Sequence, residues 1–108
     1  MTATHGLAEK TVARITSVLK SFPQVEKAVL FGSRAKGTYR RGSDVDLALI
    51  GDHLDLRTIG RIGSALDDLP LPYRFSLIAF GPRTDPEVAS HIRRVGKPIF
   101  ERDAGVRQ

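Results

Sequence analysis

Two short motifs in the first half of the chain combine residue types that can do chemistry. They are Gly32-Ser33 and Asp44-Val45-Asp46, and ten residues separate Ser33 from Asp44. Glycine has no Cβ, so a phosphate can approach its backbone closely, and a serine hydroxyl can donate a hydrogen bond to a phosphate oxygen. Ser33 also stands where it can cap a short helical turn whose backbone N–H groups face an anion. Gly32 and Ser33 therefore predict a phosphate-binding turn.

The second motif, Asp44-x-Asp46, lies in a stretch of alternating polar and apolar residues. This alternation indicates a strand, so both carboxylates leave the same face with Cα atoms about 6.6 Å apart. Such a pair suits Mg²⁺ or Mn²⁺, and without a cation the two like charges would repel each other. Either motif alone is usually a turn or a solvated strand end. Together they favour a nucleotide and metal site.

The segment between the motifs is basic. Four cations within it are predicted to neutralise a triphosphate: Arg34, Lys36, Arg40 and Arg41. The whole chain of 108 residues has 17 Lys and Arg against 12 Asp and Glu, a net charge of +5. This balance favours a polyanionic ligand or partner over a neutral one, although a solvated basic surface would give the same number.

Hydrophobic periodicity predicts the elements that hold these motifs. Apolar residues recur with helical spacing over 7–21 and 55–69, and an Asp-Pro-Glu start predicts a third helix over 85–96. We expect strands over 25–31, 44–50 and 73–80, a helical turn over 33–37, and a short extended segment over 98–100. The fold class is therefore α/β (α+β), a small mixed β-sheet of three to four strands with helices packed on it. We expect a single domain over 1–108 with frayed ends at 1–6 and 103–108.

Residues 32–37 and 42–49 together resemble the G-S-x10-D-x-D signature of the DNA polymerase β-like nucleotidyltransferases, in particular the minimal nucleotidyltransferase (MNT) class. Residues 71–75 and 91–97 are also similar to that class, so the resemblance extends from about Val25 to Arg102. It implies the polymerase β-like palm fold and transfer of a nucleoside monophosphate, with ATP as substrate, to a hydroxyl. It further implies that Gly32 and Ser33 hold the triphosphate and that Asp44 and Asp46 ligate Mg²⁺ or Mn²⁺.

One position departs from the pattern of the family. A third carboxylate, which helps to bind a metal and activates the attacking hydroxyl, is expected on the next strand, and its place is taken by Ser76. Serine is a poor Mg²⁺ ligand and a poor base near neutral pH. Asp52, Asp55 and Asp85 are the other acids to consider, and we interpret Asp85 as a helix cap and the other two as lying at the far end of the Asp44 strand.

The resemblance also implies a partner, because MNT proteins often pair with a HEPN-domain ribonuclease toxin and act as its antitoxin, some by adding AMP to a tyrosine. Two hypotheses follow: an adenylyltransferase, or a catalytically degenerate nucleotide-binding module that neutralises the toxin by complex formation. Direct nucleic-acid binding is a weaker third, since only 6% of residues are aromatic.

Several other features of the sequence bear on the cellular location of the protein. The chain has no cysteine, no membrane-length apolar stretch and a polar N-terminus, so we expect a cytoplasmic protein. The sequence is compatible with both homo-oligomers and hetero-oligomers.

We interpret His91 as a packing or surface residue beside the apolar stripe of the last helix.

Overall fold

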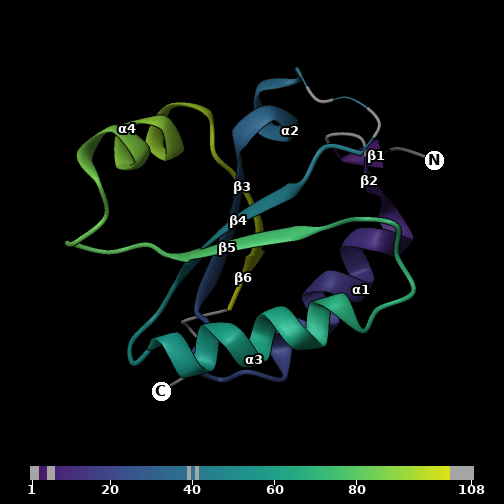
Figure 1. Cartoon of the computed structure of the whole chain (residues 1–108), viewed down its shortest axis with the longest axis horizontal. Helices are drawn as coiled ribbons and strands as arrows, with labels where there is room; N and C mark the ends of the chain where they lie inside the picture. The colour runs from purple at the N-terminus through teal and green to yellow at the C-terminus, as the bar shows by residue number, and fades with distance from the viewer. Residues whose placement is uncertain (1–2, 5–6, 39, 41, 103–108) are drawn as a thin grey trace.

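The computed structural model describes residues 3–4, 7–38, 40 and 42–102. In chain order the elements are β1 (Ala3–Thr4), β2 (Leu7–Ala8), α1 (Glu9–Lys20), β3 (Lys27–Phe31), α2 (Gly32–Lys36), β4 (Val45–Ile50), α3 (Leu56–Asp67), β5 (Phe75–Ala79), α4 (Pro86–Val95) and β6 (Lys97–Glu101). Figure 1 shows them as a sheet with helices on both sides. No helix in these ranges is long and apolar enough to cross a membrane.

The main sheet has four strands in the order β5-β4-β3-β6. β4 runs parallel to β5, whereas β3 is antiparallel to both β4 and β6. The predicted small mixed sheet is therefore confirmed. Because β4 lies in the middle, its polar positions have strands on both sides, and Asp46 pairs with Phe31 of β3 and with Ser76 of β5.

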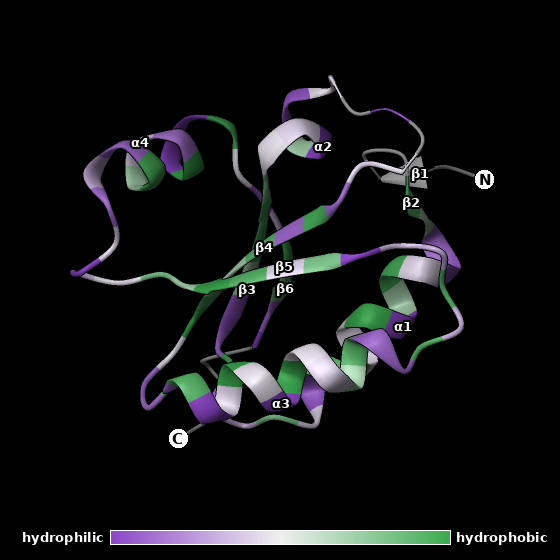
Figure 2. Cartoon of the chain, in the orientation of Figure 1, coloured by the Kyte–Doolittle hydropathy of each residue, from purple (hydrophilic) through white to green (hydrophobic). Residues whose placement is uncertain are grey.

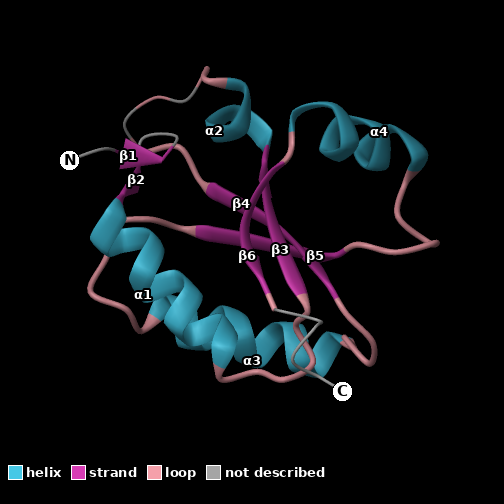
Figure 3. Cartoon of the chain, turned by 180° about the vertical axis from the view of Figure 1, so that it is seen from behind, coloured by secondary structure: helices cyan, strands magenta, loops and turns pink. Residues whose placement is uncertain are grey.

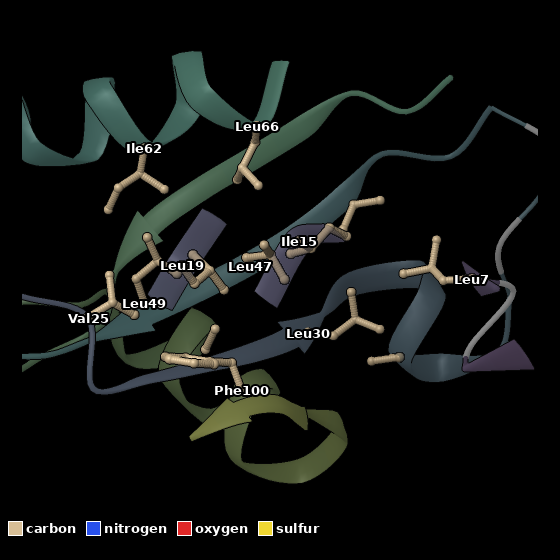
Figure 4. Packing of buried hydrophobic residues seen from close by; sticks show 13 residues of the cluster. Leu7, Ile15, Leu19, Val25, Leu30, Leu47, Leu49, Ile62, Leu66 and Phe100 are labelled. Atoms are coloured by element: carbon tan, nitrogen blue, oxygen red, sulfur yellow. The ribbon is translucent and has the colours of Figure 1, made fainter. Parts of the chain in front are cut away.

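The larger core lies between one face of this sheet and the helices α1 and α3, which lie along the same side in Figures 1 and 3. Side chains from both helices and from the strands meet there in the close-up of Figure 4. Fully buried members of this core include Ile15 and Leu19 of α1, Ile62 and Leu66 of α3, and Leu30, Leu47 and Leu49 of the sheet. Burying each such side chain contributes about 1.5–3 kcal/mol. The apolar face of β4 is thus fixed against the core, and its polar face must point the other way.

The opposite face of the sheet is covered near one end by α4, which also contacts α2 at the end of β3 (Figure 3). A smaller buried cluster forms here from Val29, Ala48 and Ile92, with Phe31 packed against it. Ala48 is two residues after Asp46 on β4, so α4 packs on the same face that carries the Asp46 carboxylate. This smaller core fixes α4 over the polar end of the sheet.

The N-terminal segment differs from the sequence prediction. Helix α1 starts at Glu9, and the two residues before it, Leu7–Ala8, pair with Ala3–Thr4 in a small antiparallel ribbon. Leu7 is fully buried in the larger core, which explains why an apolar residue precedes the helix. A frayed end over the whole of 1–6 is therefore wrong for Ala3–Thr4, and the other predicted end, 103–108, lies outside the described residues.

The other boundaries agree with the predictions to within a few residues. Hydropathy changes with helical period along α3 (Figure 2), as expected, whereas along β4 only Val45 to Leu47 alternate and the strand is apolar from Leu47 to Ile50. The side chain of Asp55 caps α3 by accepting a hydrogen bond from the Thr58 N–H at 2.8 Å. Pro86 occupies the first turn of α4, after the cap residue Asp85.

Candidate active site

The predicted phosphate-binding turn joins the end of β3 to α2. Gly32 is the first residue of α2 and has a φ of 77°, a left-handed conformation that favours glycine. The Asp46 carboxylate lies against the Gly32 backbone, and a Cβ on Gly32 would collide with it. This close contact favours glycine at position 32. We expected the missing Cβ to make room for a phosphate, but the neighbour it accommodates is Asp46. The two motifs are therefore in direct contact.

Ser33 has a different place from the one we predicted. It lies inside α2 and the residue before the helix is Phe31, which makes no side-chain capping bond. Ser33 is thus not the N-cap, although its half-buried side chain still lies one residue from Gly32.

The two carboxylates lie at the start of β4. Asp44 directly precedes the strand and is exposed, whereas Asp46 is half-buried within it. Partial burial raises the pKa of the Asp46 carboxyl above its ordinary value, the negative charge of Asp44 raises it further, and His91 partly lowers it. The net rise means that ionised Asp46 lacks enough compensating positive charge. A bound cation would supply that charge.

Ser76 lies beside Asp46 on the neighbouring strand. The two are aligned partners in the parallel β4–β5 pair, so their side chains leave the same face of the sheet. Ser76 is exposed. Among the described residues no group of three His, Cys, Asp or Glu side chains is placed to hold a metal ion. Since Mg²⁺ is commonly held by one or two carboxylates together with substrate phosphates, Asp44 and Asp46 still fit an ion that arrives with a nucleotide.

None of the alternative acids lies beside this pair. Asp85 Oδ1 accepts hydrogen bonds from the N–H groups of Glu87 and Val88 at 2.8 and 3.4 Å, so the predicted helix cap is confirmed. Asp55 caps α3, and the hydrogen bonds from Thr58 hold the pKa of its carboxyl below the ordinary value. Asp52 follows the far end of β4, as we expected.

The basic segment between the motifs divides into exposed and buried cations. Lys36 and Arg40 are exposed, and a turn holds the loop around Arg40, whose N–H donates to Ser43 Oγ at 2.8 Å. Arg41 lies outside the described residues. Both exposed cations remain predicted phosphate contacts.

Arg34 does not agree with the prediction that it binds the nucleotide. Its side chain is only 3% exposed, and Nε and Nη2 donate to the Ser43 carbonyl oxygen at 3.3 and 3.1 Å. The guanidinium also lies 4.9 Å from the centre of the Tyr73 ring. Arg34 therefore binds the loop before β4 to the segment before β5, and positions Asp44 and Ser76 indirectly.

His91 is the residue at this site that the sequence did not reveal. Its Nε2 accepts a hydrogen bond from the Gly32 N–H at 3.0 Å, and its ring meets that of Phe31 edge-on, with 6.1 Å between centres. Helical periodicity places His91 beside the apolar stripe of α4. Nothing in the sequence, however, shows that α4 crosses the Gly32 turn.

A separate hollow of about 490 Å³ lies at the opposite ends of β4 and β5. It is lined by Gly51, Leu54, Phe80 and Pro82, among others, and by none of the predicted site residues. The chemistry-bearing groups are at the other end of β4, so this hollow is not part of the candidate active site.

Comparison with known proteins agrees with this arrangement. Residues 13–105 match the family described as "Polymerase beta, Nucleotidyltransferase". The chain belongs to this nucleotidyltransferase family. The predicted mixed sheet with packed helices is thus the polymerase β-like fold.

A "Probable protein adenylyltransferase MntA" from Haemophilus influenzae is 29% identical over 101 residues, 93% of this chain and 88% of its own. Two solved structures share the fold. One, "Crystal structure of the toxin-antitoxin with AMP-PNP", gives a TM-score of 0.67 at 23% identity over 87% of this chain and 76% of the other. The second contains a tri-AMPylated HEPN toxin from Shewanella oneidensis in complex with an MNT antitoxin, with a TM-score of 0.63 at 20% identity over 86% and 71% of the two chains.

Proposed function

We propose that this nucleotidyltransferase transfers AMP from ATP, with Mg²⁺ or Mn²⁺, to a side-chain hydroxyl of a HEPN-domain toxin and thereby acts as its antitoxin. The observation that carries the proposal is the contact between the two motifs, in which the Gly32 backbone lies against the Asp46 carboxylate. A nucleotide held at the turn would have its phosphates beside Asp44 and Asp46. The family match and the adenylyltransferase relative support this reaction class.

The reaction forms a bond between the acceptor oxygen and the α-phosphorus of ATP. The bond from the α-phosphorus to the bridging oxygen breaks, and pyrophosphate leaves with that electron pair. Asp44 and Asp46 would hold the metal ion, which neutralises charge on the phosphates when bound. Ser33, Lys36 and Arg40 would bind the triphosphate, and catalysis would come from positioning and charge neutralisation.

Ser76 determines where the acceptor proton goes. A carboxylate at this position would take the proton as the acceptor oxygen attacks, but a serine hydroxyl does not do so near neutral pH. We propose that the proton passes to solvent instead, because Ser76 is exposed. Since a positioned base contributes about 10²–10⁴-fold, we expect slow transfer.

The proposed partner follows from the neighbours in fold. The MNT antitoxin described above is in complex with an AMPylated HEPN toxin. A slow enzyme is sufficient for such a role, because a stable complex with its protein substrate gives it many chances to react.

The test uses cells that express the toxin together with the wild-type protein or Asp44→Ala. The proposal predicts survival with the wild-type protein and recovery of toxin that carries AMP, and neither result with Asp44→Ala. Asp67→Ala is the matched control, since it removes an exposed aspartate from α3, away from the carboxylate pair. Survival with unmodified toxin would overturn the transfer reaction.

Ser76 also favours a second candidate, a binding module that neutralises the toxin by complex formation alone. In that case Asp44→Ala and Asp46→Ala would still protect cells. Variants that still bind the toxin but no longer protect cells would rule this candidate out.

A further inference from the structure

We propose that His91 is a positioning residue of the nucleotide site, which holds the Gly32-Ser33 turn in place through the Gly32 N–H. The inference deepens the proposed function, because it rests on ATP binding at that turn. His91 acts on the turn and not on the substrate.

The contact joins residues that are far apart in the sequence. Gly32 and His91 are separated by 59 positions, and the 3.0 Å hydrogen bond joins the start of α2 to α4. The edge-on contact between the rings of His91 and Phe31 lies directly beside it. Two neighbouring residues of the β3–α2 junction thus meet the same imidazole.

Helix α4 is well suited to hold this imidazole still. On either side of His91, Ala89 and Ile92 are buried, and Ile92 packs with Val29 and Ala48 on the sheet. The first turn of α4 is capped by Asp85. His91 therefore stands on an element that is fixed to β3 and β4, the strands that carry the two motifs.

The chemistry of the bond limits what His91 can do. In this contact Nε2 is the acceptor, because a nitrogen that accepts a hydrogen bond carries no proton. The Nε2 lone pair is occupied by Gly32 and is not available to take a proton from an acceptor hydroxyl. Likewise the Gly32 N–H is not available to a phosphate oxygen, so we expect the Ser33 hydroxyl to donate to the phosphate at this turn. His91 is therefore not the replacement for the missing third carboxylate.

The Gly32 turn also lies against Asp46, so its orientation affects the metal site. Without the acceptor on α4, a half-buried N–H would lose its partner and the turn would shift to satisfy it. Such a shift would move the phosphate-binding groups relative to the Asp46 carboxylate. We expect binding of ATP to weaken, with little effect on the step that follows.

The test compares His91→Leu with His91→Gln, whose amide oxygen can reach the place of Nε2. Ser90→Ala is the matched control, an exposed neighbour on the same helix. ATP affinity in the presence of Mg²⁺ and the KM and kcat of transfer to the partner toxin are measured for each variant, with thermal melting to confirm folding. His91→Leu should raise Kd and KM for ATP about two- to twelvefold, the equivalent of one net hydrogen bond, with kcat within about twofold of wild type. His91→Gln should recover most of the affinity.

Equal affinities for His91→Leu and wild type would overturn the inference, and so would a fall in kcat at constant KM, which a base would give. If His91→Leu does not fold, His91→Asn, whose amide is shorter, takes its place beside His91→Gln.

A second measurement does not depend on activity. In the wild-type protein the N–H···N bond predicts an NMR coupling across the hydrogen bond between the Gly32 nitrogen and His91 Nε2, and its absence in a folded sample would refute the contact. If the wild-type protein shows this coupling but neither binds ATP nor transfers AMP, the proposed function fails while the contact stands.

Discussion

Replacing Ser76 by Asp restores a carboxylate at the position where the family pattern has one. Ser76 is the aligned partner of Asp46 across the parallel strands β4 and β5, and adjacent strands are about 4.8 Å apart. The new side chain would leave the same face of the sheet as Asp46 and reach solvent, because Ser76 is exposed. It can therefore act both as a metal ligand and as a base for the acceptor hydroxyl.

The expected magnitudes differ with and without metal. Two unit charges about 5 Å apart repel by about 1–3 kcal/mol at effective dielectric constants between 80 and 20, with the lower figure favoured at an exposed position. Without metal, Ser76→Asp should lower the melting temperature near neutral pH. With Mg²⁺ and ATP this loss should be reversed, and transfer should be faster by up to about 10²–10⁴-fold, the usual contribution of a positioned base.

The assay follows transfer of label from α-³²P-ATP to the partner toxin, together with melting temperatures with and without Mg²⁺. Ser76→Asn is the matched control, since it has nearly the same shape as Asp but no charge. If Ser76→Asp and Ser76→Asn have the same transfer rate and the same response to Mg²⁺, our reasoning about this position is wrong.

Three further predictions concern the elements around the site. Gly32→Ala should cost about 1–2 kcal/mol of folding free energy, because alanine is strained in the left-handed conformation of this residue. It should also abolish ATP binding in calorimetry, because the new Cβ displaces the Asp46 carboxylate. ATP binding like that of wild type would contradict the contact. Because burial and the charge of Asp44 raise the Asp46 pKa in the folded state, ionisation destabilises the metal-free fold. Asp46→Asn should therefore raise the melting temperature near neutral pH, with a gain that disappears as the pH falls below about 3.9, and a gain that persists there would refute this assignment. Asp85→Ala should lower the unfolding free energy, measured in urea, by about 1 kcal/mol, because it removes the cap of α4. Asp85→Ser should retain most of this stabilisation, since Ser also caps helices. Equal losses for the two variants would argue against the cap.

The elements that could be predicted are those with a strong local pattern. The alternation of Val45, Leu47 and Leu49 with Asp44 and Asp46 defines both the strand and its two faces, because only one face can be buried. The motif spacing and family resemblance placed Ser76 beside the carboxylates, and the β4–β5 register agrees. The Asp85 cap was also predictable, since an Asp before a helical stripe has few other local roles, whereas the predicted Ser33 cap was wrong.

The details that could not be predicted depend on contacts between distant segments. The charge of Arg34 is visible in the sequence and predicts a phosphate ligand. The sequence does not show that this side chain is buried against Tyr73 and the Ser43 carbonyl oxygen. The role of His91 depends on where α4 crosses the sheet. The sequence predicts that Leu7 starts a helix, because an apolar residue that joins the core as a short strand has the same local pattern.

Label transfer in a purified system is the most direct test of the central claim. The protein, its HEPN partner and Mg²⁺ are incubated with either α-³²P-ATP or γ-³²P-ATP, and the toxin is then separated and counted. Transfer of AMP predicts label on the toxin from α-³²P-ATP only, and no label from either nucleotide with Asp44→Ala. An unlabelled toxin with the wild-type protein, or label from γ-³²P-ATP, would contradict the account.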